Sequence, residues 1–375
     1  MYRTNWCNLA TAFAVAIAPL FFAGNLSAQV TESNSSQTSW QSANPNIYPP
    51  TLDEQTLFVN GERTIEAWDT TNGSRIWSQS LKSAAVFQPR VAGDLLLISG
   101  RHDISIYQKR SGKIQWNISA NREFSVPLLH KGLLVVGDGH LLMAFNLSTG
   151  KQQWEFATTG NARIGYAPIG YGETILLGAG NGVLYSLSVE SGELLWKVDR
   201  ESDWQYLRQL DISNGMLVAG GYHDELFGID PDSGVMKWRF NAGNFVNSEL
   251  VKDDSVYFWS PTGWIYALDT TNGKVRWRHR TINYTNPAYP GSWSSIMAEI
   301  EADDEHLYIL AMDNVLHLLD RKTGEEVACY MVEQSLRPFV TLSPRKGELF
   351  FGTRLGELIK TSTSELKSCR FIYPG

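Results

Sequence analysis

Short apolar runs separated by polar turns set the pattern of this chain from about residue 50 onward. In Ile265–Asp269, side chains alternate between two faces with a period of two, which is typical of a β-strand. The next residues include Asn272 and Gly273, which tolerate the positive φ of a tight turn. A second run then ends at Trp277. The stretch predicts a β-hairpin.

This hairpin recurs about every forty residues. In the first six copies a tryptophan follows the turn glycine by four residues, whereas the seventh copy has Ala328 at that place. An eighth copy has Glu365 and Cys369 where the others have glycine and tryptophan. The turn glycines are Gly73, Gly112, Gly150, Gly192, Gly234, Gly273 and Gly324, and the tryptophans are Trp77, Trp116, Trp154, Trp196, Trp238 and Trp277.

A further apolar run precedes each hairpin, after its own polar turn. These runs are Thr56–Asn60, Leu95–Ser99, Leu133–Gly137, Thr174–Gly178, Met216–Gly220, Ser255–Ser260, His306–Ala311 and Glu348–Gly352. Eight units of four strands predict an all-β fold, an eight-bladed β-propeller of four-stranded antiparallel blades over residues 47–375. Because a blade alone cannot bury both of its apolar faces, we expect the six tryptophans to have a structural role, packed between blades.

Two segments compete for the outer strand of the last blade. A strand around Trp40 would close the ring with the N-terminal end of the chain, and Glu365–Tyr373 would close it with the C-terminal end. The pattern alone leaves both possibilities open.

The first residues resemble a secretory signal peptide. Leu9–Ala23 is apolar and follows Arg3, and small residues precede a cleavage point after Ala28. The run is short for a membrane anchor and contains Pro19. We therefore expect residues 1–28 to be removed and the protein to be periplasmic.

The segment that follows, residues 29–46, is rich in Ser, Thr and Asn and predicts a flexible leader. Cys7 precedes the apolar run instead of lying at the cleavage point, so we expect no lipid anchor. The two remaining cysteines, Cys329 and Cys369, are candidates for a disulfide in an oxidising compartment. If the Trp40 strand closes the ring, the C-terminal tail is free to pair with the outer edge of the seventh blade and to bring these cysteines together.

Candidate chemistry is sparse. The net charge of −7 disfavours nucleic acid as a partner. Gly178–Gly182 resembles a phosphate-binding loop but lies between two predicted strands, so a tight turn is the better reading. His306 and His317 fall within strands, and the acidic pairs of Asp253-Asp254 and Asp303-Asp304-Glu305 fall in turns. We expect no catalytic residues, no metal ligands and no cofactor.

Two connections between predicted blades are long and rich in arginine and aromatic residues, as protein interfaces are. They span Val198–Leu207 and Arg278–Ser295. We therefore expect a monomeric, non-enzymatic protein that binds a protein partner. Candidate binding residues in and beside these connections are Trp204, Arg208, Arg280, Tyr289 and Trp293.

The repeat resembles the pyrroloquinoline-quinone-type propeller repeat, with its Ala-Leu-Asp-x-x-Thr-Gly-x-x-x-Trp core. Within that group the chain is most similar to the BamB family of outer-membrane β-barrel assembly proteins, which bind no quinone. The similarity is carried by Arg163–Pro168, by Gly178–Gly182, and by Gly324–Ala328, where the seventh blade lacks its tryptophan. It implies that Arg163, with Tyr166 beside it, binds a component of the assembly machine.

Two enzyme classes are the alternatives to a non-enzymatic function. Quinone-dependent dehydrogenases carry an adjacent cysteine pair above the cofactor, and no two cysteines are adjacent here. A propeller glycosidase or lyase needs two carboxylates at a defined separation in the central channel, a possibility that the sequence leaves open.

Overall fold

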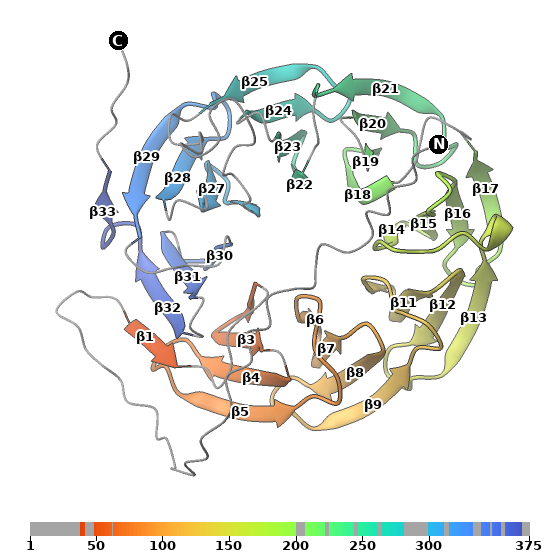
Figure 1. Ribbon diagram of the computed structural model, residues 1–375, viewed down its shortest axis with the longest axis horizontal. Helices are drawn as coiled ribbons and strands as arrows, with labels where there is room; N and C mark the ends of the chain where they lie inside the picture. Colours follow the sequence, from red (N-terminus) through yellow and green to blue (C-terminus); the bar gives the residue numbers. More distant parts are fainter. Residues whose placement is uncertain are drawn as a thin grey trace, which may run out of the picture.

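The computed structural model is a ring of eight β-sheets around a central axis (Figure 1). It describes residues 38–41, 49–61, 63–199, 207–221, 225–243, 247–260, 264–280, 299–310, 315–332, 339–345, 347–353 and 357–369. Apart from the short 3₁₀ helix η1 (Thr159–Asn161), the regular elements in this part of the chain are strands. The prediction of an all-β, eight-bladed propeller is confirmed.

Each blade is an antiparallel sheet whose strands run in order from the central axis to the outside. Blades 1 to 3 comprise β2 (Thr51–Asp53), β3 (Thr56–Asn60), β4 (Thr64–Asp69) and β5 (Arg75–Ser80); β6 (Arg90–Ala92), β7 (Leu95–Ser99), β8 (Asp103–Gln108) and β9 (Ile114–Ser119); and β10 (Leu128–His130), β11 (Leu133–Asp138), β12 (Leu141–Asn146) and β13 (Gln152–Ala157). Blades 4 to 6 comprise β14 (Ile169–Tyr171), β15 (Thr174–Gly178), β16 (Leu184–Ser188) and β17 (Leu194–Val198); β18 (Leu207–Ser213), β19 (Met216–Gly221), β20 (Glu225–Ile229) and β21 (Met236–Asn241); and β22 (Asn247–Lys252), β23 (Ser255–Trp259), β24 (Ile265–Asp269) and β25 (Val275–His279).

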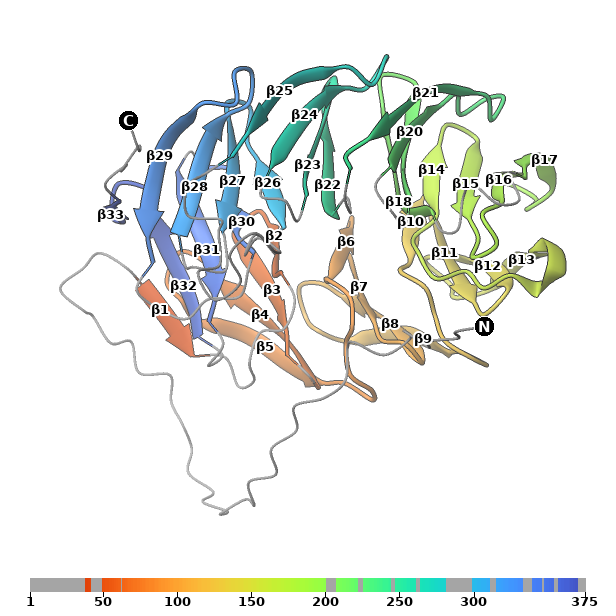
Figure 2. The same ribbon diagram turned by 45° about the horizontal axis from the view of Figure 1, so that its top comes forward.

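The last two blades depart from this plan. Blade 7 has five strands: β26 (Ile300–Ala302), β27 (His306–Leu310), β28 (Val315–Asp320), β29 (Glu326–Met331) and β33 (Lys367–Ser368). Blade 8 combines β30 (Thr341–Leu342), β31 (Glu348–Gly352) and β32 (Glu357–Ser362) with the N-terminal β1 (Thr38–Gln41). The N-terminal β1 therefore closes the ring beside β32, and the C-terminal β33 lies on the outer strand of blade 7 (Figure 2).

Ring closure corrects the predicted flexible leader. Thr38–Gln41 falls inside residues 29–46, yet it forms strand β1 and pairs with β32, Thr38 opposite Lys360. One edge of this strand is hydrogen-bonded to β32 of the last blade, so this part of the leader belongs to the propeller. The rest of the leader and residues 1–28 lie outside the described residues.

The core lies between blades, as the alternation predicted. The second and third strands of a blade are almost wholly buried, as in β3 and β4, where only the terminal residues are partly exposed. The outer strands, such as β5, alternate exposed and partly buried residues. Separate apolar clusters join consecutive blades, for example Tyr257 and Trp277 of blade 6 with Leu307 of blade 7.

A repeated tryptophan contact joins the first seven blades. At each junction the indole lies against the turn glycine of the next blade; Gly273, for example, has φ of 68°, and a Cβ there would lie 2.6 Å from Trp238 Cε3. The indole N–H also donates to a carbonyl oxygen in the same turn. These pairs are Trp77 with Lys109 (3.0 Å), Trp116 with Leu147 (2.9 Å), Trp154 with Val189 (2.8 Å), Trp238 with Thr270 (2.8 Å) and Trp277 with Arg321 (2.9 Å), while Trp196 lies against Gly234.

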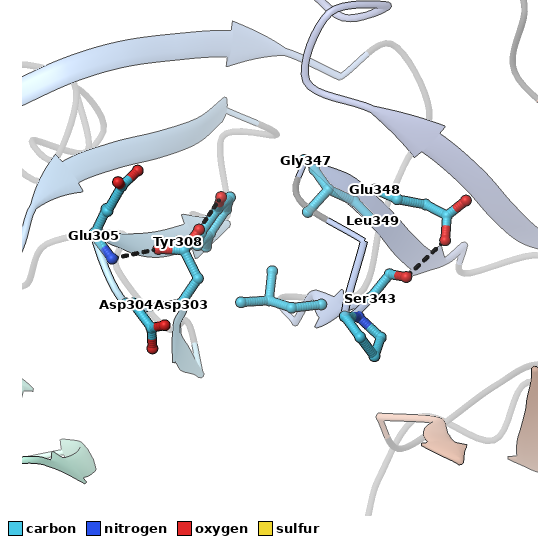
Figure 3. A pocket seen from close by; sticks show the side chains of 10 residues that line it. Asp303, Asp304, Glu305, Tyr308, Ser343, Gly347, Glu348 and Leu349 are labelled. Carbon is cyan, nitrogen blue, oxygen red and sulfur yellow. Dashed lines mark hydrogen bonds between the residues drawn. The ribbon is translucent and has the colours of Figure 1, made fainter. Parts of the chain in front are cut away.

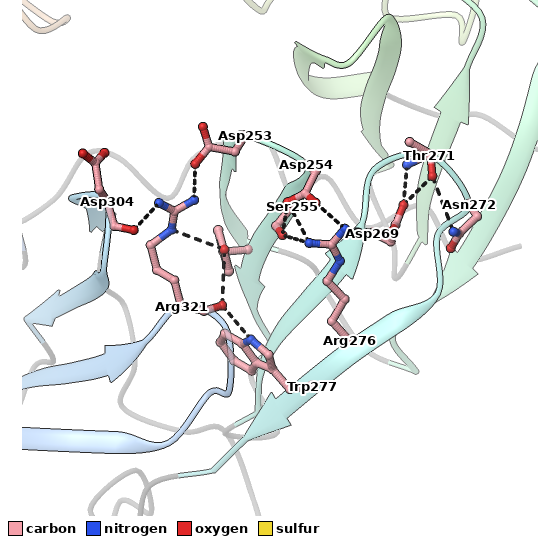
Figure 4. A network of polar contacts seen from close by, with 11 residues as sticks. Asp253, Asp254, Ser255, Asp269, Thr271, Asn272, Arg276, Trp277, Asp304 and Arg321 are labelled. Atoms are coloured by element: carbon pink, nitrogen blue, oxygen red, sulfur yellow. Dashed lines mark hydrogen bonds and ion pairs between the residues drawn. The ribbon is translucent and has the colours of Figure 1, made fainter.

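Around Trp277 the contact is extended by two arginines (Figure 4). The guanidinium of Arg321 binds the Asp253 carboxylate at 2.6 Å and donates to the backbone oxygens of Asp303 and Asp304, while the Arg321 carbonyl accepts the Trp277 indole. Arg276 bridges Asp254 and Asp269 at 2.7 and 2.8 Å. The hydrogen bond from Arg276 is the main cause that lowers the pKa of Asp269 to about 2. Arg321 of blade 7 thus binds an acidic turn of blade 6, and Arg276 binds acidic residues within its own blade.

Within the described residues, no helix is long and apolar enough to cross a bilayer.

Candidate functional site

The two ends of the propeller carry different connections between strands. The connection from each outer strand to the next blade lies at one end of the propeller, and so does the turn between the second and third strands of each blade. We call this end the crossover face. The opposite end, which holds the remaining hairpin turns, is called the turn face. Arg163 lies on the crossover face, in the connection between β13 and β14.

Arg163 lines a pocket of about 390 Å³ formed by connections from blades 2, 3 and 4. We call it the Arg163 pocket. Its lining residues are His102, Arg122, Glu123, Gly139, His140, Asn161 and Arg163. Because consecutive blades stack side by side, residues as far apart in the sequence as His102 and Arg163 line one cavity.

The backbone at Arg163 is fixed on both sides. The Gly180 N–H donates to the Arg163 carbonyl at 2.9 Å, and the Ile164 N–H donates to the Gly139 carbonyl at 2.7 Å. The Ile164 side chain is only 1% exposed and packs on Gly137, where a Cβ would approach it to 2.5 Å. The guanidinium is therefore presented from a rigid base although its side chain is 61% exposed.

Glu123 orients this guanidinium. Its carboxylate lies 2.5 Å from Arg163 Nη2 and 3.8 Å from Nη1 of Arg101, which approaches from the β7–β8 connection. Ion pairs this exposed contribute roughly 0–1 kcal/mol to stability, so they are weak enough to be exchanged. Arg101, Arg122 and Arg163 outnumber the carboxylates of Glu123 and Asp138 here, which leaves a net positive charge and an excess of hydrogen-bond donors, suited to an acidic group.

A buried aspartate shapes the neighbouring wall of the pocket. Asp138, 3% exposed, accepts hydrogen bonds from the backbone N–H groups of Asn121 (2.6 Å) and Arg122 (2.7 Å). The Arg122 side chain then lies over Gly139, where a Cβ would come within 2.6 Å of Arg122 Cδ. Sequence reasoning missed Asp138 and Arg122. The available signal was an aspartate ending a buried strand, which is a frequent acceptor for backbone N–H groups of a loop.

Of the other predicted binding residues, Tyr166 and Arg280 have side chains that the structure describes, and neither lines this pocket. Tyr166 is partly buried in the same connection but does not line the cavity. Arg280 lies at the end of β25 in blade 6, where it and Arg278 lie over the Trp264 ring at 5.8 and 4.5 Å. Arg208 is in strand β18 instead of in a loop, with its side chain outside the described set, and Trp204, Tyr289 and Trp293 lie outside the described residues.

A second pocket, of about 280 Å³, lies on the turn face between blades 7 and 8 (Figure 3). Its carboxylates have partners within the chain: Asp303 accepts from the Tyr308 hydroxyl at 2.8 Å, and Glu348 accepts from Ser343 at 2.6 Å. Its charged lining residues are acidic, whereas arginines line the Arg163 pocket.

Two histidines in strands, His279 and His317, lie beside the Glu326 carboxylate, a contact that the sequence pattern did not predict. His317, 1% exposed, has Nδ1 2.6 Å from Glu326 Oε1, and His279 of blade 6 has Nε2 3.6 Å from the other oxygen. Burial would raise the pKa of Glu326, but the contacts with His279 and His317 outweigh it, so the pKa lies below its usual value. In the described ranges no group of three or more His, Cys, Asp or Glu side chains is placed to hold a metal ion.

The comparisons with known proteins support the propeller repeat that the sequence pattern indicated. The family model described as "Outer membrane protein assembly factor BamB" matches residues 27–126, 100–212 and 181–335. Two relatives with that name come from Moranella endobia (21% identical over 271 residues, 65% of this chain and 70% of the relative) and Yersinia pestis (23% over 298 residues, 72% and 73%). A tetrathionate hydrolase from Acidithiobacillus ferrooxidans is 24% identical over 222 residues, covering 50% of this chain and 44% of that enzyme.

Solved structures share the fold at low sequence identity. BamB from Moraxella catarrhalis has a TM-score of 0.67 at 14% identity, covering 89% of this chain and 99% of that one. A quinohemoprotein alcohol dehydrogenase from Pseudomonas putida HK5 has the same TM-score at 10% identity, with 90% and 77% covered, so the fold alone does not separate scaffold from enzyme. The family model matches most of the chain, so this protein belongs to the family of outer membrane protein assembly factor BamB.

Proposed function

We propose that this protein is a non-enzymatic propeller scaffold that binds a protein component of outer-membrane protein assembly through the Arg163 pocket. The observation that supports this most is an exposed guanidinium held on a fixed backbone within a cationic cavity. A preorganised arginine loses little conformational entropy on binding, and it pairs bidentately with a carboxylate of a partner. The family relationship supplies the class of partner.

The proposal predicts that Arg163→Glu abolishes partner recovery. Charge reversal removes the donor fork and places a carboxylate beside Glu123. Loss of an interface hot spot costs about 2 kcal/mol or more, an affinity decrease of roughly thirtyfold. The measurement is a pull-down from membrane extract with tagged mature protein, followed by identification of the recovered proteins.

Arg110→Glu is the matched control, because Arg110 is exposed and lies in the β8–β9 turn on the turn face. It makes the same charge change and should leave recovery unaltered. If Arg163→Glu recovers the same proteins as the wild type while its circular dichroism spectrum stays unchanged, the Arg163 pocket is not the binding site. Tyr166, Trp204, Arg208, Arg280, Tyr289 and Trp293 remain secondary candidates for the same test.

The proposal includes the absence of a cofactor. A quinone-dependent oxidoreductase is the rival function for this fold, and it would bind pyrroloquinoline quinone with Ca²⁺ stoichiometrically in an absorbance titration. Such binding would overturn the scaffold assignment.

Export is a separate prediction. Because the apolar run at residues 9–23 ends before a small-residue cleavage point, the form recovered from the periplasm should begin at Gln29. N-terminal sequencing of that form checks the cleavage. Recovery of the chain in the cytoplasm with Met1 intact contradicts export.

A further inference from the structure

The junction between blades 7 and 8 is built differently from the six before it. Ala328 stands where the other outer strands have the tryptophan, and Glu365 stands where the next blade would have its turn glycine. This junction therefore has neither the tryptophan nor the turn glycine of the repeated contact. An alanine also buries far less area than the 150–250 Å² of an aromatic side chain.

The chain segment that leaves β32 occupies this junction instead. Having completed the third strand of blade 8, it crosses to the outer strand of blade 7, where β33 pairs with β29 through Tyr330 opposite Ser368 and Met331 opposite Lys367. Cys369 donates its N–H to the Cys329 carbonyl at 3.0 Å, and the two cysteines form a disulfide with their Cα atoms 5.4 Å apart. Cys329 directly follows Ala328, so the covalent bond lies beside the missing indole.

Apolar burial accompanies the bond. Leu366, in the turn before β33, is 7% exposed and belongs to the cluster that joins Leu318 and Val332 of blade 7 to Ile359 of blade 8. Ala328 packs at the edge of the same cluster. The segment Leu366–Cys369 thus supplies both an apolar side chain and a link between two blades, which are the two contributions of the tryptophan elsewhere.

On its other side, blade 8 packs against blade 1. There the Lys360 Nζ donates at 2.9 Å to the carbonyl of Thr70, the residue that corresponds in blade 1 to the indole acceptors of the other blades. The outer strand of blade 8 is β1, which pairs with β32 through the backbone. Within the described residues, blade 8 therefore lacks the repeated tryptophan contact to blade 7 and meets blade 1 through Lys360.

We propose that the Cys329–Cys369 disulfide is a redox-controlled clasp that fastens blade 8 to blade 7. In forming it, the two thiols lose two protons and two electrons to a disulfide oxidant such as oxidised glutathione, which becomes two thiols. The oxidised chain holds blade 8 closed, and the reduced chain opens locally at blades 7 and 8. Ring rigidity thereby depends on an oxidising compartment, where such bonds persist.

Hydrogen–deuterium exchange of the folded, full mature chain tests the clasp, with mass spectrometry before and after reduction by a phosphine. Reduction should speed exchange by about tenfold or more in β29, β31 and β32, because local opening determines exchange there. Strands β23 and β24 of blade 6, joined through tryptophan contacts on both sides, are the internal control and should not change. Unchanged exchange in blades 7 and 8, or an equal increase in all blades, overturns the proposal.

The double variant Cys329→Ser with Cys369→Ser should reproduce the reduced pattern and show no response to the phosphine. Should this variant fail to fold, the wild-type chain reduced after folding still provides the result. Two free thiols in denatured, unreduced monomer would also overturn the proposal. Neither outcome bears on Arg163, which lies in the connection between blades 3 and 4.

Discussion

Replacing Trp277 by alanine is expected to lower the free energy of unfolding by about 3–5 kcal/mol, the usual cost of removing a buried tryptophan. The side chain is 8% exposed and packs against Gly324 of blade 7. Its loss leaves a cavity that the backbone of the Gly324 turn cannot fill. The Arg321 carbonyl also loses its indole donor. Chemical denaturation followed by circular dichroism measures the change.

Val275→Ala is the control on the same strand, since Val275 is 45% exposed and should change stability by less than about 0.5 kcal/mol. Equal midpoints for the Trp277 and Val275 variants would show that the tryptophan contact does not hold the blades together.

Glu301→Gln is expected to stabilise the protein at alkaline pH by up to about 3 kcal/mol. Glu301 lies in β26, the inner strand of blade 7; burial, aided by the nearby charge of Glu299 and opposed by Lys252, raises its pKa to about 7. The folded protein therefore holds the Glu301 proton more tightly than the unfolded chain, whose carboxyl titrates near 4.5. The resulting stability is complete below pH 4.5 and is lost as the pH rises to 7.

Glutamine stays neutral, so the variant should lack this loss. Denaturation midpoints between pH 4 and 9 should show wild type and variant converging at acid pH and separating above pH 7. Glu325→Gln, at an exposed position in the same blade, serves as the control. A Glu301→Gln midpoint below that of the wild type at pH 8 would contradict the assignment.

Much of the fold could be predicted because local signals and the global architecture agree. The apolar run Leu95–Ser99 became β7 with the same bounds, and Thr174–Gly178 became β15. Glycines such as Gly273 have the positive φ that the hairpin turn requires. The closing strand could not be predicted, because a segment around Trp40 and one around Cys369 both have strand-like patterns. Only the pairing of Thr38 with Lys360 distinguishes them.

The candidate site was predicted less completely. Arg163 stood out through a short resemblance, but Arg101, Arg122 and His140 approach it from other blades, and no local pattern encodes contacts between blades. Lys360 is a similar case: in the sequence it is one lysine in a strand, and only the stacked ring brings it to the Thr70 carbonyl. Side-chain partners across a junction depend on blade geometry, which the strand pattern does not specify.

The pairing of β1 with β32 also constrains the order of folding. Thr38 lies near the start of the chain and Lys360 near its end, so this pair cannot form until nearly the whole chain is available. Such a contact has a very large sequence separation, and closing long loops is what slows the folding of β-proteins. The first six blades each consist of strands that follow one another directly and can assemble in the order of synthesis. Completion of blade 8 must come after them, and until then β32 has an unpaired edge.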